Sequence, residues 1–493
     1  MKRILLIGPY GRNIRAGQFL SPPLGVYRLA SYIQNKCGVD VVDPHLDREE
    51  VNRLLKENKY EIIGHSIIQP TIENSLRTIF TAYDLQPLAL QIAGGQGAVF
   101  NYEELLKKSP IQVIVRGFGE FQLERILDSE KEGLTQIPGL YLKHDEKISA
   151  TELSNPISID SFKKITLGMN FSTIPYEKYW RLMSNHYSAE NLKVMKNEGL
   201  INTIRLVTST YCPVGCSYCS STKFLNEGSR LKQKVLRLEA PDVIEMMKNA
   251  VTAHPDTESF YFNDDNFTGD LDELDKFCDS LHTLVKPYNL VCQGRINDAQ
   301  DDILKKMKMV GFKLIYYGVE TFSTRLARVL KRTHNGHYED MARQAILSTL
   351  KAGIVPQMSL MLFIPQTKIS DLETTINNAI DLIEKGARIA VLPYVEAYRG
   401  TDIIRDHALS YDEFEIKGVK FRFPDIIPPD EEDIRVLARD AMKLKESLNQ
   451  DFTNKYFKPV PQPVDCLNLF MSIYKLIGKP TDKIKSLIDR LMS

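Results

Sequence analysis

Long apolar runs are missing from this chain of 493 residues. A transmembrane helix needs roughly 20 consecutive apolar residues, and no stretch approaches that length, so no membrane span is expected. The N-terminus starts with the basic residues Lys2 and Arg3, but the apolar run that follows is too short for a signal peptide and stops at Gly8. The sequence therefore predicts a cytoplasmic protein, in a compartment that keeps thiols reduced.

An excess of charge of either sign is missing as well. Lysine and arginine number 63, aspartate and glutamate also number 63, and the two kinds are mixed along the chain. Proteins that bind nucleic acid usually gather basic residues into a patch or a stripe. We therefore expect no nucleic-acid partner. A small molecule is favoured as substrate over RNA, and a peptide stays open.

Cysteine is scarce, with seven in the whole chain. A long chain with few cysteines and no secretory signal is not typical of a protein held together by disulfides. Four of the seven are scattered, namely Cys37, Cys278, Cys292 and Cys466. The other three, Cys212, Cys216 and Cys219, stand in one short segment with the spacing C-x3-C-x2-C.

This spacing favours an iron–sulfur cluster over zinc. Structural zinc usually takes four protein ligands, commonly from two C-x2-C pairs, and no nearby histidine completes such a set. Iron–sulfur clusters are held by thiolates, typically at short cysteine spacings. Three thiolates can hold three irons of a four-iron cluster and leave the fourth iron open to a small chelating ligand. Such a site indicates an enzyme more than a binding module.

At these residues the chain resembles the radical S-adenosylmethionine (SAM) superfamily, whose signature is C-x3-C-x-aromatic-C. The resemblance implies that the amino and carboxyl groups of SAM chelate the open iron, and that one-electron reduction releases a 5′-deoxyadenosyl radical. It also implies an electron donor such as flavodoxin or ferredoxin. The SAM contacts that it implies are Tyr218, in the aromatic position of the signature, Asp264, Asp265, Arg295 and Glu320.

Strands and helices alternate over residues 1–140, the first predicted domain. The predicted strands are 3–7, 39–42, 62–64, 88–93 and 113–115. A helix is predicted after Pro22-Pro23, because proline suits a first helical turn. This order predicts an α/β fold with a Rossmann-like, doubly wound parallel sheet, whose ligand crevice lies at the carboxyl ends of the strands.

Residues at those strand ends resemble the cobalamin-binding domain that precedes many radical SAM barrels, and the likeness covers residues 1–140. The cobalamin contacts that it implies are Tyr10, Arg12, Ser66, Gly94, Gly95, Gly117, Gly119 and Glu120. Glycine would let the backbone approach a large flat ligand closely. Tight turns between strand and helix explain the same glycines without a ligand.

The better-known cobalamin motif, D-x-H-x-x-G, is only half matched by Asp43-Pro-His45. Arg48 stands where the motif needs glycine, and the segment follows the second predicted strand instead of the first. We therefore expect His45 to be a loop histidine and not an axial ligand of cobalt.

After a polar, irregular connector over 141–200, the alternation of strands and helices restarts. The predicted strands are 204–207, 260–262, 290–293, 314–317, 358–363 and 389–392. Six such units predict a partial (β/α)6 barrel of the TIM type over 201–402, with the chemistry at the strand C-termini. Asp264 and Asp265 could pair with the amino group of SAM, and Arg295 could pair with its carboxyl group. Alternatively, the two aspartates form an exposed acidic turn and Arg295 forms a surface salt bridge. Residues 403–493 have a largely helical pattern.

Both resemblances together imply a cobalamin-dependent radical methyltransferase. One SAM would methylate cobalamin, and a second would yield the radical that attacks an unactivated carbon, which then collects the methyl group from methylcobalamin. A non-methylating oxidation, ring contraction or cyclisation with the same cofactors stays open. A methylthiotransferase is disfavoured because residues 1–200 hold only Cys37 for a second cluster. A cobalamin-binding sensor would not need the cysteine loop.

Overall fold

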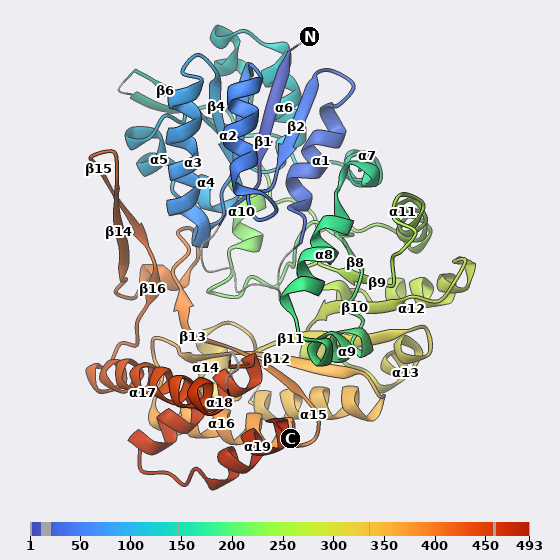
Figure 1. Cartoon of the computed structure of the whole chain (residues 1–493), viewed down its shortest axis with the longest axis vertical. Helices are drawn as coiled ribbons and strands as arrows, with labels where there is room; N and C mark the ends of the chain where they lie inside the picture. The colour runs from blue at the N-terminus through green and yellow to red at the C-terminus, as the bar shows by residue number, and fades with distance from the viewer. Residues whose placement is uncertain (1, 11–20, 146, 335, 457–459, 493) are drawn as a thin grey trace.

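The computed structural model describes residues 2–10, 21–145, 147–334, 336–456 and 460–492. Two seven-stranded sheets form its main bodies. Figure 1 shows the N-terminal sheet with its helices at one end of the long axis, the second sheet in the middle, and the C-terminal helices at the other end. Within the described residues, no helix is both long and apolar enough to span a bilayer.

The N-terminal sheet has the strand order β2-β1-β3-β4-β5-β6-β7. Its first five strands are parallel and confirm the five predicted ones: β1 (Arg3–Ile7), β2 (Gly38–Val42), β3 (Ile62–Ser66), β4 (Leu90–Gly94) and β5 (Val113–Val115). The antiparallel strands β6 (Leu140–His144) and β7 (Lys147–Ala150) extend the sheet beyond β5. The strand order reverses between β1 and β3, where doubly wound sheets bind their ligands.

Helices cover both faces of this sheet, which confirms the doubly wound prediction. They are α1 (Leu24–Ile33), α2 (Arg48–Glu57), α3 (Ile72–Leu85), α4 (Gln96–Phe100), α5 (Tyr102–Lys108) and α6 (Gly119–Asp128). Ile4 and Leu6 of β1 pack with α1 and α6, whereas Leu5 and Ile7 pack with α2 and α3. A strand buried on both faces must be apolar throughout, which explains the run of β1.

The connector between the two sheets is helical, so the expectation of an irregular segment was wrong. Its helices are α7 (Ile159–Leu167), α8 (Tyr176–His186) and α9 (Ala189–Asn197). Ser158 and Ser188 cap α7 and α9 with their side chains, a signal that is visible in the sequence. Trp180 of α8 packs in the core of the second sheet and donates from Nε1 to the carbonyl of Thr203 at 3.2 Å.

The second sheet curls into a half-barrel of six parallel strands, as predicted. In chain and spatial order they are β8 (Thr203–Leu206), β9 (Ser259–Phe262), β10 (Asn289–Gly294), β11 (Phe312–Glu320), β12 (Val355–Phe363) and β13 (Arg388–Glu396). The helices that alternate with them are α10 (Ser221–Glu227), α11 (Ala240–Ala253), α12 (Leu271–Ser280), α13 (Asp301–Met309), α14 (Thr324–Val329), α15 (Tyr338–Lys351) and α16 (Ile369–Glu384). The short antiparallel strand β16 (Ile426–Ile427) pairs with β13.

The last part of the chain begins with a β-hairpin that the largely helical interpretation missed. Its strands are β14 (Tyr411–Ile416) and β15 (Val419–Pro424), and Lys417 and Gly418 make the turn with φ values of 51° and 78°. Two positive φ angles suit a two-residue hairpin turn. Phe421 and Phe423 pack against the N-terminal domain, in the core that contains Leu76 of α3. The helices α17 (Glu432–Tyr456), α18 (Gln462–Leu476) and α19 (Asp482–Met492) follow, as expected.

Candidate active site at the junction of the two sheets

The loop between β8 and α10 holds the three clustered cysteines. Gly215 adopts a φ of +70°, a conformation that favours glycine, and the amide of Cys219 donates to the carbonyl of Cys216 at 3.2 Å. The hydroxyl of Thr222 in α10 donates to the carbonyl of Cys212 at 2.7 Å. The loop therefore folds tightly back on itself and brings its three thiols to the start of α10.

Burial governs the protonation of two of these thiols. It raises the pKa of Cys212, against the charge of Arg295, and it raises the pKa of Cys219 to about 12. The free thiols of Cys212 and Cys219 are therefore neutral at physiological pH, and assembly of a cluster must release their protons. Among the described residues, no three His, Cys, Asp or Glu side chains are grouped as ligands of a single metal ion. In a four-iron cluster each thiolate binds a different iron.

Arg332 is a site residue that sequence reasoning missed. Its Nη1 lies 3.4 Å from the sulfur of Cys216, and its Nη2 donates to the carbonyl of Gly318. Tyr218 and Glu320 lie beside it, and burial raises the pKa of Glu320 while Arg332 and Tyr218 oppose the shift. Glu320 itself has a φ of +67° at a bulge in the β11–β12 pairing. Two of the predicted SAM contacts, Tyr218 and Glu320, therefore lie together beside Arg332 and Cys216.

The two neighbouring aspartates have different surroundings. Asp264 is 1% exposed and accepts hydrogen bonds from the amide and hydroxyl of Thr208, at 2.8 and 3.1 Å, and from the hydroxyl of Ser209, at 2.5 Å. Asp265 is exposed and accepts from the hydroxyl of Ser221 at the start of α10. Asp264 therefore links the segment after β9 to the segment after β8 by hydrogen bonds. Asp265 is the carboxylate beside the cysteine loop.

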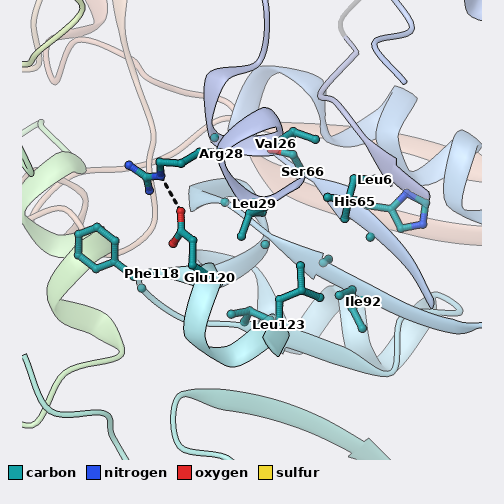
Figure 2. A pocket seen from close by; sticks show the side chains of 18 of the residues that line it. Leu6, Val26, Arg28, Leu29, His65, Ser66, Ile92, Phe118, Glu120 and Leu123 are labelled. Carbon is teal, nitrogen blue, oxygen red and sulfur yellow. Dashed lines mark hydrogen bonds and ion pairs between the residues drawn. The ribbon is translucent and has the colours of Figure 1, made fainter. Parts of the chain in front are cut away.

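A cavity of about 220 Å³ lies at the carboxyl ends of β1, β3, β4 and β5, between these strands and helices α1 and α6 (Figure 2). Six of the predicted cobalamin contacts line it: Ser66, Gly94, Gly95, Gly117, Gly119 and Glu120. Phe224 and Leu225 of α10 line it from the side of the second sheet. The helix that follows the cysteine loop therefore also forms part of the wall of this cavity.

Tyr10, another predicted contact, is not among the described lining residues. Tyr10 packs against His45, with ring centroids 5.2 Å apart, and the guanidinium of Arg48 lies 5.6 Å from the Tyr10 ring. Arg12 lies outside the described residues. His45 is also absent from the cavity wall, and its Nδ1 lies 3.0 Å from Asp43. His65 does line the cavity, and burial lowers its pKa to about 4, so its ring is neutral.

Two known families match separate parts of the chain. The radical SAM superfamily matches residues 206–379, and the B12 binding domain matches residues 14–127. The chain contains a radical SAM domain and a B12-binding domain. The cofactors of these two domains are a four-iron cluster with SAM, and cobalamin.

Solved structures share the fold over most or all of this chain. The radical SAM methyltransferase TsrM from Kitasatospora setae aligns with a TM-score of 0.67 at 14% identity, over 87% of this chain and 86% of TsrM. The cobalamin-dependent radical enzyme OxsB, solved with aqua-cobalamin and SAM, aligns with a TM-score of 0.67 at 14% identity, over 100% of this chain and 75% of OxsB. At these identities the likeness establishes the fold.

Sequence relatives carry two different activities in their names. An uncharacterized methyltransferase of Pyrococcus horikoshii is 24% identical over 77% of this chain and 78% of its own length. The anaerobic magnesium-protoporphyrin IX monomethyl ester cyclase of Rubrivivax gelatinosus is 25% identical over 89% of this chain and 75% of its own length. The names of these relatives therefore differ in the reaction that they state.

The cavity in the B12-binding domain fits a corrinoid by two features. A Cβ on Gly94 would find no atom of the described residues within 4 Å, so none of them requires a glycine there. Gly95 differs, because its φ of +90° and the carbonyl of Ile67, 2.6 Å from a Cβ, exclude a side chain. Glu120 accepts from Arg28 at 2.5 Å through Oε1, but its buried Oε2 has no partner in the part of the chain that the structure describes. That oxygen can accept from an amide or hydroxyl of a bound corrinoid.

The cysteine loop offers groups that fit SAM. Arg295 follows β10, its charge acts on Cys212, and its buried Nε has no hydrogen-bond partner among the described residues. A guanidinium pairs well with a carboxylate, such as that of the methionyl group. Asp265 offers the opposite charge for the amino group.

Alanine substitutions should distinguish the structural role of Asp264 from the SAM-binding role of Asp265. Asp264→Ala leaves the Thr208 amide buried without a partner and is expected to lower the free energy of unfolding by about 2–4 kcal/mol. Asp265→Ala should leave stability unchanged and weaken SAM binding about 10-fold, the loss expected for one charge-assisted hydrogen bond. Urea unfolding and equilibrium dialysis with SAM measure the two effects. An Asp265→Ala protein that binds SAM like the wild type would contradict this assignment.

Proposed function

We propose that this radical SAM protein transfers a methyl group from SAM, by way of cobalamin, to an unactivated carbon of a small molecule. The observation that carries the proposal is the position of α10. Its N-terminus adjoins Cys219, and its Phe224 and Leu225 line the cavity of the B12-binding domain. The Ser220 hydroxyl also donates to Gln96 of α4 at 2.5 Å. The two cofactor sites therefore face each other across one short helix.

When bound, the cluster and SAM supply a carbon-centred radical, and cobalamin supplies the methyl group. The chain would hold the cluster with Cys212, Cys216 and Cys219. Asp265 and Arg295 would orient the amino and carboxyl groups of SAM. A substrate held between the two sites would undergo both hydrogen abstraction and methyl transfer without leaving the protein, which gives the high effective concentration of an intramolecular reaction.

The similarity to the magnesium-protoporphyrin ester cyclase favours a second candidate. In that case the same cofactor sites would serve an oxidation or ring closure without methyl transfer. Both candidates need the cysteine loop and the cavity, so the described geometry supports the two alike. The two reactions differ in the fate of the SAM methyl group, so a label on that group distinguishes them.

The test uses SAM with a deuterated methyl group. Reconstituted enzyme would be incubated anaerobically with a reductant and candidate substrates, and the products would be analysed by mass spectrometry. Methyl transfer predicts deuterium in the product, with S-adenosylhomocysteine and 5′-deoxyadenosine formed in equal amounts. Formation of 5′-deoxyadenosine and an unlabelled product, without S-adenosylhomocysteine, would overturn methyl transfer and support the second candidate.

A further inference from the structure

Three basic side chains surround Asp402 on the surface of the half-barrel. Lys223 of α10 lies 3.1 Å from this carboxylate, Lys331, which follows α14, lies 2.9 Å from it, and Arg405 lies 3.8 Å from it. The side chains of the three are 43%, 53% and 70% exposed. One carboxylate shared by three cations leaves positive charge in excess, although the chain as a whole is neutral. We call Lys223, Lys331 and Arg405 the basic surface.

The basic surface is joined to the cysteine loop through backbone hydrogen bonds. The amide of Ser217 donates to the carbonyl of Leu330 at 3.0 Å, and the amide of Ile403 donates to the carbonyl of Ser217 at 3.0 Å. Ser217 follows Cys216 directly, and Lys331 precedes Arg332, which contacts the Cys216 sulfur at 3.4 Å. The segments that carry Lys331 and Arg405 are therefore each one hydrogen bond away from a neighbour of Cys216.

Apolar packing holds this region in place. Leu330 and Ile403 are buried in one small cluster, and Tyr218 of the cysteine loop packs against it. The exposed cations thus stand on a fixed support that also positions a cluster ligand. A surface built in this way suits the docking of a partner better than a set of isolated lysines on a mobile loop.

We propose that the basic surface docks an acidic one-electron carrier protein that reduces the enzyme. Transient electron-transfer complexes bury little surface, so complementary charge contributes much of their association rate and specificity. The carrier, a flavin protein of the flavodoxin type, would lose one electron and the oxidised cluster would gain it, with no group transferred. This inference rests on the cluster site and is independent of whether the reaction transfers a methyl group.

Binding of reduced flavodoxin to the holoenzyme tests the proposal. A Lys223→Glu, Lys331→Glu, Arg405→Glu triple variant is expected to raise the Kd about 100-fold at low salt, and to lose most of the dependence of the Kd on ionic strength. Lys305→Glu, on α13, is the matched control and should bind like the wild type. Iron content and dithionite bleaching of the triple variant report whether the cluster site is intact. A triple variant with an intact cluster and wild-type affinity would overturn the proposal.

Asp402→Asn separates docking from a purely structural role of the ion pairs. The variant removes the carboxylate that binds the three cations, but it leaves the basic surface more positive. Docking predicts a flavodoxin Kd equal to that of the wild type or up to about 3-fold lower. If the ion pairs served only to hold the loops together, Asp402→Asn would weaken binding as the triple variant does, and the proposal would fall. No measurable binding of flavodoxin to the wild type would overturn it as well.

Discussion

A Cys216→Ala variant is expected to release no 5′-deoxyadenosine from SAM. Cys216 is the most buried of the three loop cysteines, and Arg332 contacts its sulfur at 3.4 Å. Without this thiolate, one iron of the cluster has no protein ligand, and the site that would bind SAM is lost with it. Liquid chromatography of the nucleoside product and iron analysis of the reconstituted protein measure both effects.

Cys466→Ala is the matched control for this experiment. Cys466 lies buried in α18, away from the cysteine loop, and its loss should lower stability modestly without changing iron content or SAM cleavage. The comparison separates a cluster ligand from a buried cysteine outside the cysteine loop. SAM cleavage by the Cys216→Ala protein at the rate of the control would refute the cluster assignment.

Enlarging Gly94 is expected to block cobalamin binding. A Cβ at this position meets no atom of the described residues within 4 Å. We therefore expect Gly94→Ala and Gly94→Leu both to fold, so that a loss of affinity reflects a clash with the ligand. Overpacking of this kind costs about 1–3 kcal/mol, which corresponds to a Kd raised about 10-fold for alanine and about 100-fold for leucine. Titration with hydroxocobalamin, followed by its absorption, measures both constants.

The cluster site supplies the internal control for the Gly94 variants. Their iron content and thermal unfolding should match those of the wild type, because Gly94 lies in the other sheet and its Cβ direction is open. Unchanged cobalamin affinity in Gly94→Leu would mean that the cavity is not where the corrinoid binds.

Local pattern was enough to predict both parallel sheets. Apolar runs such as Ile4–Ile7 have one structural solution, because a strand covered by helices on both sides must be apolar throughout. Cysteine spacing likewise predicted the loop. The hairpin of β14 and β15 was missed, although Phe414, Phe421 and Phe423 alternate with polar residues around a Lys-Gly turn. That alternation was visible in the sequence and was outweighed by the helical pattern after it.

The directions of side chains and the contacts between distant residues could not be predicted from the sequence. Asp264 and Asp265 are adjacent and chemically identical, and only the fold decides that one is buried under β8 while the other faces the cysteine loop. Gly94 and Gly95 cannot be told apart in the sequence either, yet only at Gly95 does the backbone conformation require glycine. Arg332 reaches Cys216 from 116 residues away and belongs to no motif. Such contacts depend on tertiary packing, which single-sequence patterns do not contain.

One anaerobic absorption spectrum tests the central claim, that a cluster site and a cobalamin site adjoin in this chain. Protein would be reconstituted with iron, sulfide and hydroxocobalamin and then desalted. We predict corrinoid bands retained on top of broad cluster absorption, with the corrinoid bands alone reduced in Gly94→Leu and the cluster absorption alone reduced in Cys216→Ala. Cluster absorption without any retained corrinoid in the wild type would contradict the account.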